Sequence, residues 1–195
     1  MIVNRELKEK ILKKRKIILV TLIILLLIFV LFKLKDEVLK KLYPIEYSEY
    51  VYKYSEENNI DPLLVFSIIK AESNFKRSAT SNSGAIGLMQ LMPETAKEML
   101  EIIGDDYVIK EQLYNPEQNI KIGTRYYSWL YKKYNNPELV MAAYNAGIGN
   151  VDDWISQGII KKDGSDLENI PYKETNNYVR KILRNYRIYQ YLYGE

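Results

Sequence analysis

The sequence predicts a mainly α-helical domain that follows a single N-terminal transmembrane helix, and three observations support this prediction. An uninterrupted apolar run lies near the N-terminus. Farther along, proline repeatedly follows an aspartate or asparagine, an arrangement typical of helix starts. Apolar residues after these starts recur at helical spacing, whereas no stretch alternates for long as a strand would. We therefore divide the chain into residues 1–16, 17–34, 35–44 and 45–195.

Residues 1–16 form a basic tail, with seven Lys or Arg side chains against two Glu. The net charge of the whole chain is only +3, so the remainder of the chain is close to neutral. A nucleic-acid-binding domain would need a basic face on its folded part. No nucleic-acid partner is therefore expected, and the positive charge is better explained by the apolar segment that follows it.

Residues 17–34 are predicted to be a transmembrane anchor. The run "IILVTLIILLLIFVLF" contains 16 residues, of which only Thr21 is polar. At about 1.5 Å per residue it spans ~24 Å of a ~30 Å hydrocarbon core, and flanking lysines can reach the interfaces. No small-residue cleavage site follows, which favours an uncleaved anchor over a signal peptide. The positive-inside rule places the tail in the cytoplasm and the domain outside the cell membrane.

Residues 35–44 are predicted to be a connector, helical in part and broken near Pro44. Within residues 45–195, helix starts are predicted at Asp61-Pro62, Asn115-Pro116 and Asn136-Pro137, and at Pro93. Gly147 and Gly149 are expected to end a helix and turn the chain. Near the C-terminus one helical face carries Tyr178, Ile182, Tyr186 and Tyr189. The soluble part is thus expected to be one helical domain.

The composition narrows the chemistry, because the chain contains no histidine and no cysteine. Thiol nucleophiles, Ser-His and Cys-His dyads and the usual His/Cys zinc sites are excluded. Carboxylates, hydroxyls, amides and lysines remain as candidate groups. No metal and no cofactor is expected.

Glu72 is the candidate catalytic residue. On a helix that begins at Pro62, it continues the apolar stripe of Leu64 and Ile68. Burial disfavours the charged form of a carboxyl group and raises its pKa. A carboxyl group that holds its proton near neutral pH can donate it to a leaving oxygen, as in glycosidases. In the alternative interpretation Glu72 reaches into solvent or caps the following loop, and the residues alone favour neither.

Four sequence blocks, in order, resemble the soluble-type lytic transglycosylases, the SLT-domain family. The blocks are "ES" at 72–73, "SGAIGLMQLMPETA" at 83–96, "AAYNAG" at 142–147 and "IPYKETNNYV" at 170–179. The resemblance implies a goose-type lysozyme-like helical fold. It also implies an enzyme that cleaves the β-1,4 bond between N-acetylmuramic acid and N-acetylglucosamine without water, giving 1,6-anhydro-N-acetylmuramic acid ends. Peptidoglycan glycan strands are then the expected partner, and the membrane that holds the anchor is expected to be a bacterial cell membrane.

The resemblance also implies roles for individual residues. Glu72 matches the single catalytic acid/base, which protonates the leaving oxygen and then takes the proton of the muramic acid 6-hydroxyl. The substrate, rather than a second carboxylate, supplies the nucleophile. The matching substrate-binding positions are Ser81, Gln90, Met92, Tyr144, Asn145 and Glu174. Tyr144 and Asn145 are expected to face the acid across a cleft, whereas Glu174 either binds substrate or fixes the C-terminal helix.

Two other functions remain open from the sequence. A goose-type lysozyme-like hydrolase would share the fold and the acid but would use water. It would need another acid to position that water, and the candidates are Asp152, Asp153 and Glu174. A membrane-anchored wall-binding assembly factor would keep the fold without turnover. The sequence does not indicate which cell-envelope machinery, if any, the protein serves.

Overall fold

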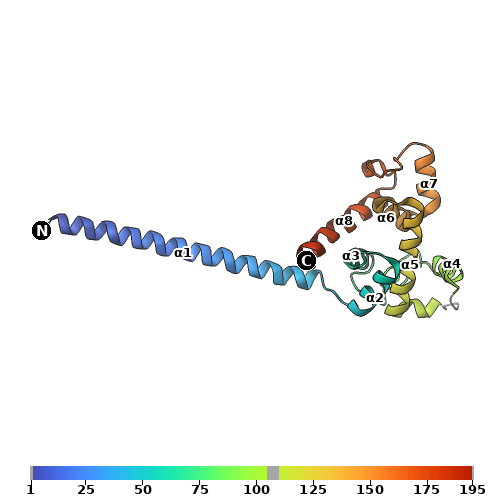
Figure 1. The fold of residues 1–195 in the computed structure, drawn as a ribbon, viewed down its shortest axis with the longest axis horizontal. Helices are drawn as coiled ribbons and strands as arrows, with labels where there is room; N and C mark the ends of the chain where they lie inside the picture. Colours follow the sequence, from blue (N-terminus) through green and yellow to red (C-terminus); the bar gives the residue numbers. More distant parts are fainter. Residues whose placement is uncertain (1, 105–109, 195) are drawn as a thin grey trace. The chain divides into compact units, whose positions relative to one another are not determined.

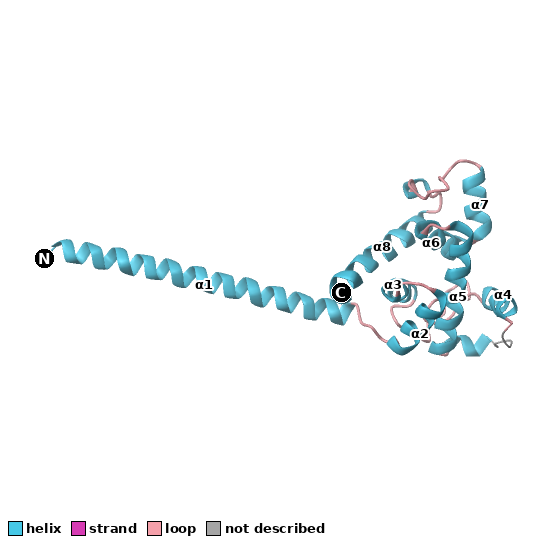
Figure 2. Ribbon diagram, viewed as in Figure 1, coloured by secondary structure: helices cyan, strands magenta, loops and turns pink. Residues whose placement is uncertain are grey.

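The computed structural model describes residues 2–104 and 110–194 and divides into two units, residues 1–44 and 45–195, which are treated separately. Within the described residues the secondary structure is helical, and β pairing is limited to isolated bridges (Figure 2). The predicted mainly α-helical fold class is confirmed.

The first unit is a single helix, α1 (Ile2–Leu42). In the described part of the chain it is the one helix that is long and apolar enough to cross a membrane, and its apolar stretch is not buried against other residues. The basic tail and residues 35–42 belong to this same helix, so the helix extends beyond the segment 17–34 at both ends. It ends just before Tyr43-Pro44, where the proline disfavours a helical conformation of the preceding residue.

The second unit is built from packed helices (Figure 1). They are α2 (Ser48–Asn58), α3 (Pro62–Glu72), α4 (Pro93–Ile103), α5 (Pro116–Tyr134), α6 (Pro137–Ala146), α7 (Ile148–Ser156) and α8 (Lys173–Tyr193), with short 3-10 turns at Lys110–Tyr114 and Leu167–Asn169. Helix α3 packs against α2 and α8, and α6 packs against α5, α7 and α8. Helices α3, α6 and α8 therefore share one core.

Local signals in the sequence set the helix starts. The side-chain oxygens of Asp61, Asn115 and Asn136 each accept a hydrogen bond from a backbone N–H of the first turn, as helix-capping residues do. Helix α4 begins at Pro93. These four predicted starts are confirmed.

One predicted turn is wrong. Gly147 ends α6 with a φ of 85°, as predicted. Gly149 instead lies inside α7. The positive φ of Gly147 alone is enough to redirect the chain. The next helix therefore begins directly after it, at Ile148.

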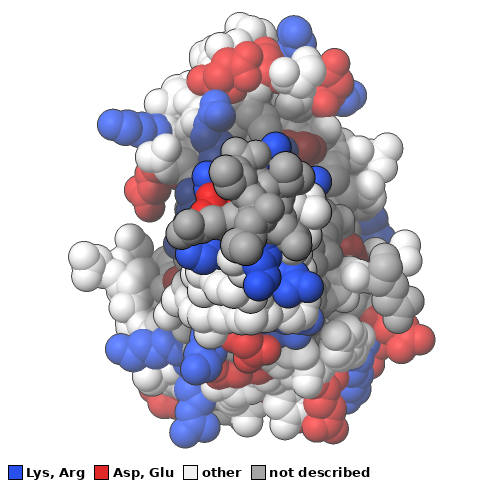
Figure 3. Space-filling view, turned by 90° about the vertical axis from the view of Figure 1, so that its left-hand side faces the viewer, with Lys and Arg blue, Asp and Glu red and all other residues white. Residues whose placement is uncertain are grey.

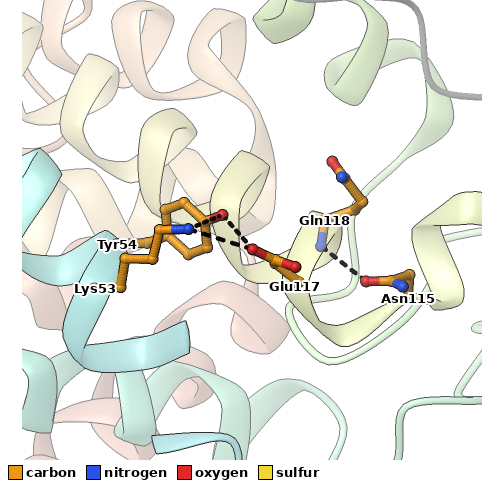
Figure 4. Close-up of polar contacts among 5 residues, drawn as sticks. All are labelled: Lys53, Tyr54, Asn115, Glu117 and Gln118. Atoms are coloured by element: carbon orange, nitrogen blue, oxygen red, sulfur yellow. Dashed lines mark hydrogen bonds and ion pairs between the residues drawn. The ribbon is translucent and has the colours of Figure 1, made fainter. Parts of the chain in front are cut away.

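A polar cluster ties α2 to the start of α5 (Figure 4). The Tyr54 hydroxyl donates to Glu117 Oε1 at 2.9 Å, and Lys53 Nζ donates to the same oxygen at 3.4 Å. Asn115 caps α5 beside them by accepting from the Gln118 N–H. Because the Lys53–Glu117 pair is half-exposed, water screens it, and its contribution is to orientation more than to stability.

Charges of both signs cover the protein surface that Figure 3 shows. Lys and Arg side chains are interspersed there with Asp and Glu side chains. On that face of the described residues, the charges do not gather into one continuous basic surface.

Asn119 anchors the loop between α3 and α4 to α5. Its buried amide accepts from Met89 N–H at 2.7 Å and donates to the carbonyls of Ile86 and Leu113, both at 2.9 Å. Gly87, with a φ of 82°, lies so close that an added Cβ would fall 2.3 Å from Asn119 Nδ2. One buried side chain thus holds two backbone groups of the segment that carries Gln90 and one of the 3-10 turn Lys110–Tyr114.

Replacing Asn119 by alanine is expected to destabilise the protein by about 3 kcal/mol, because buried backbone groups lose their partners. Urea unfolding of the full chain in detergent micelles measures this loss. Asn177→Ala, at an exposed position of α8, is the matched control and should stay within about 0.5 kcal/mol of the parent. Equal stability of the two variants would contradict the anchoring role.

Candidate active site

Glu72 is the last residue of α3 and is partly buried between α3 and α8. Its Oε1 accepts a hydrogen bond from the hydroxyl of Tyr178, in α8, at 2.6 Å. Leu64 and Ile68, which precede it on the same helical stripe, are buried. The carboxyl group is therefore turned toward the protein, not extended into solvent.

Three influences set the protonation of Glu72. Burial is the largest and raises the pKa of this carboxyl; with all three influences together, the pKa rises from 4.5 to about 7. The Tyr178 hydrogen bond and the positive charge of Lys181 oppose the effect of burial, since both stabilise the carboxylate. Lys181 is held beside the site by donating to the carbonyl of Ala71. The carboxyl group is thus balanced between its two forms near neutral pH.

A cavity of about 180 Å³ brings together four of the predicted residues, namely Gln90, Met92, Tyr144 and Asn145. The Tyr144 hydroxyl donates to the Met89 carbonyl at 2.9 Å. Burial raises the pKa of Tyr144 well above its ordinary value, and the charge of Glu72 adds to this rise. Glu72 is not among the residues that line the cavity, but Tyr144 lies in the wall and within its electrostatic reach.

Gln90 has a backbone φ of 47°, in the left-handed region that favours glycine. Its Nε2 donates to the carbonyls of Gly87 at 2.8 Å and Ala79 at 3.3 Å. Both amide hydrogens are thereby used. The amide oxygen is the Gln90 group that can accept a hydrogen bond from a ligand in the cavity.

Asn145 is oriented by a residue that the sequence analysis missed. The hydroxyl of Thr175, a buried residue of α8, donates to Asn145 Oδ1 at 2.8 Å. With its oxygen occupied, Asn145 offers its amide N–H groups to the cavity. Thr175 and Tyr178 are three residues apart on α8, a spacing that places both on one helix face. The helical stripe through Tyr178 was visible in the sequence, but its contact with Glu72 was not.

Ser81 and Glu174 do not line this cavity in the described structure. The Ser81 hydroxyl accepts from the Ala85 N–H at 3.0 Å, and its backbone N–H donates to the Ala85 carbonyl at 2.9 Å, so Ser81 shapes its own loop. Glu174 is exposed in the first turn of α8, where a carboxylate stabilises the helix dipole. This position fits the interpretation in which Glu174 fixes the C-terminal helix.

A larger cavity, of about 480 Å³, lies elsewhere, between the α2–α3 turn and α5. Its lining includes Asp61 and Arg125 but none of the predicted site residues. The larger cavity is therefore not the one that contains the predicted site residues. We assign the site to the smaller cavity because its wall contains Tyr144, which is within electrostatic reach of Glu72, a carboxyl group with a pKa of about 7. Within the described residues, no three His, Cys, Asp or Glu side chains gather into a metal site.

Tyr178→Phe is expected to raise the pKa of Glu72 above its value of about 7, because the lost O–H group stabilised the charged form. NMR titration of ¹³C-labelled glutamate carboxyls in the full chain in micelles measures this directly. Tyr186→Phe is the matched control, since it removes a hydroxyl on the same helix that donates to Asp61. An unchanged or lower pKa in Tyr178→Phe would contradict the role given to this hydrogen bond.

Comparison with known proteins identifies the family of this chain. The model of the family "Transglycosylase SLT domain" matches residues 49–165. The soluble lytic murein transglycosylase of Salmonella typhimurium is 34% identical over 160 residues, covering 80% of this chain. The membrane-bound lytic murein transglycosylase C of Actinobacillus pleuropneumoniae is 37% identical over 116 residues, covering 54% of this chain and 32% of the relative. The chain spans about a quarter of the length of the soluble relative.

Solved structures give the same result. The 70 kDa soluble lytic transglycosylase of Escherichia coli superposes with a TM-score of 0.73 at 32% identity, covering 80% of this chain and 26% of that one. An inactive glutamate-to-glutamine mutant of lytic transglycosylase Slt from Pseudomonas aeruginosa gives a TM-score of 0.70 at 34% identity, covering 76% and 24%. These similarities confirm the predicted lysozyme-like helical fold. The chain belongs to the transglycosylase SLT domain family.

Proposed function

We propose that the domain is a peptidoglycan lytic transglycosylase that cleaves the β-1,4 bond between N-acetylmuramic acid and N-acetylglucosamine and leaves 1,6-anhydro-N-acetylmuramic acid ends. The observation that carries the proposal is a single carboxyl group, Glu72, with a pKa of about 7 beside a cavity walled by Tyr144. Family membership supports the reaction class. One similar structure is an inactive glutamate-to-glutamine mutant, which agrees with one essential acid.

In the proposed reaction Glu72 acts twice. As an acid it gives its proton to the glycosidic oxygen while the bond from that oxygen to C1 of the muramic acid breaks. The 6-hydroxyl oxygen of the same sugar then bonds to C1, and its proton passes to the Glu72 carboxylate. The carboxyl group is restored, and no water is consumed. The Tyr178 hydrogen bond stabilises the carboxylate between the two transfers.

The cavity residues would position the sugars. Asn145, with its oxygen held by Thr175, would donate to a sugar or acetamido oxygen. Gln90 would accept from a hydroxyl or amide group through its amide oxygen, since its Nε2 already donates to two carbonyls. Met92 is 37% exposed at the cavity, where a flexible thioether can pack against the apolar face of a sugar ring.

A hydrolase is less well supported. It would need a second acid near Glu72 to position water. Asp152 is instead engaged by Lys133 at 2.9 Å and by the Tyr134 hydroxyl at 3.0 Å. Glu174 is exposed on α8 and does not line the cavity in the described structure. A wall-binding factor without turnover would have no use for a carboxyl group poised between its two forms.

Glu72→Gln is expected to lower the release of soluble wall fragments by more than about a hundredfold, because loss of a general acid/base costs this much. Mass spectrometry of muropeptides should show anhydro ends from the parent protein. Glu56→Gln, an exposed change in α2, is the control and should keep full activity. Reducing-end muramic acid as the product would reject the transglycosylase reaction, and persistent cleavage by Glu72→Gln would reject the role of Glu72.

We also propose that α1 anchors the domain in the membrane, with the basic tail in the cytoplasm. The apolar, unburied stretch of α1 and a membrane-bound relative support this arrangement. Protease added outside spheroplasts is expected to remove the domain and to spare a tag placed at the N-terminus. Digestion of the tag would contradict the orientation. Release of the domain from the membrane fraction before protease is added would indicate a cleaved signal peptide instead.

A further inference from the structure

Tyr172 is an exposed aromatic ring held in one place. It directly precedes α8 and is 49% exposed. The ring of the buried Trp154, in α7, lies 5.0 Å away between centroids at an angle of 84°. The Tyr172 hydroxyl donates to Asn150 Oδ1 at 3.2 Å. The packed ring and the hydrogen-bonded hydroxyl together restrict the conformation of this exposed side chain.

The contact with Trp154 leaves Tyr172 able to stack on a ligand. In an edge-to-face pair, one ring presents its edge to the face of the other. If Trp154 presents the edge, one face of Tyr172 is covered and the other is open. If Tyr172 presents the edge, both of its faces are open. Either arrangement leaves at least one aromatic face uncovered by Trp154 on a residue that is half-exposed.

A chain of two hydrogen bonds joins this ring to the cavity of the candidate site. Asn150 accepts from the Tyr172 hydroxyl and, through Nδ2, donates to the Ala146 carbonyl at 2.7 Å. Ala146 and Gly147 line the cavity beside Asn145. The aromatic ring is therefore next to the α6–α7 end of the cavity, separated from it by one side chain.

We propose that Tyr172 forms an outer sugar-binding platform that holds a ring of the glycan strand beyond the sugars at the cleaved bond. The inference rests on the proposed function. A pyranose ring is apolar on its faces and polar at its edge, so it can stack on a tyrosine while its hydroxyls meet the neighbouring Asn150 amide. Because the platform lies outside the cavity, only a strand long enough to reach it gains this contact.

The test compares a short and a long ligand on the full chain in detergent micelles. The probes are peptide-free glycans of alternating N-acetylglucosamine and N-acetylmuramic acid, a tetrasaccharide and an octasaccharide, titrated by calorimetry onto Glu72→Gln to prevent turnover. Adding Tyr172→Ala is expected to weaken octasaccharide binding about tenfold, the effect of losing one aromatic contact, and to leave tetrasaccharide binding unchanged. Tyr172→Phe should retain most of the octasaccharide affinity.

Two further variants separate the loss of the aromatic face from a general effect of removing a tyrosine. Tyr172→Leu preserves apolar bulk against Trp154 and should weaken octasaccharide binding as Tyr172→Ala does. Tyr52→Ala removes a matched tyrosine, 48% exposed and edge-on to Phe66, and should change neither affinity. Parent-like octasaccharide binding by Tyr172→Ala and Tyr172→Leu, or equal loss for both ligands, would overturn the platform alone. If the Glu72→Gln parent binds neither oligomer, both the platform and the proposed function fail.

Discussion

The hydrogen bond between Tyr178 and Glu72 is the interaction on which the site depends, because it crosses the seam between α3 and α8. Packing brings the two helices together: Phe66 of α3 stacks on Tyr189 of α8 with ring centroids 5.8 Å apart. That apolar contact fixes the position of the helices, and the hydrogen bond then fixes the carboxyl group at the end of α3. Without a rigid seam, a carboxyl group at a helix end would turn into water and regain its ordinary pKa.

The raised pKa of Glu72 also lowers the stability of the folded protein where this carboxyl group is ionised. Between pH 4.5 and about 7 the folded protein holds the Glu72 proton that the unfolded chain releases. The contribution of Glu72 to folding therefore becomes less favourable as pH rises through this window, and above it the cost is on the order of 3 kcal/mol. The Tyr178 hydrogen bond and the Lys181 charge keep the cost from being larger. The reaction proposed for the domain requires such a compromise, since a fully stabilised carboxylate could not act as an acid at neutral pH.

The sequence predicts what depends on neighbouring residues and misses what depends on distant ones. Asp61 and Pro62 start a helix by contacts within one turn, and that start was predicted correctly. The apolar stripe that leads to Glu72 made burial one of two alternatives, and in the structure the side chain is partly buried. Its partner Tyr178 is 106 residues away, and the Thr175 that orients Asn145 is 30 residues away, so no local pattern names either pair. Ser81 was placed among the binding residues by resemblance; its hydroxyl accepts a hydrogen bond within its own loop, and its role in binding stays a prediction.

Helix α8 gives the block "IPYKETNNYV" its physical meaning. Within the block, Tyr178 donates to Glu72 and Thr175 donates to Asn145; Lys181, just after the block, donates to the Ala71 carbonyl beside Glu72. These three side chains come from two turns of one helix, so a small rotation of α8 would disturb the acid and the cavity wall together. Glu174, in the first turn, lies where a carboxylate stabilises the helix dipole. In the reaction proposed above, one protonating group would serve two proton transfers, and helix α8 would support both, since it moderates the pKa of Glu72 and orients Asn145, the cavity residue proposed to hold the sugar.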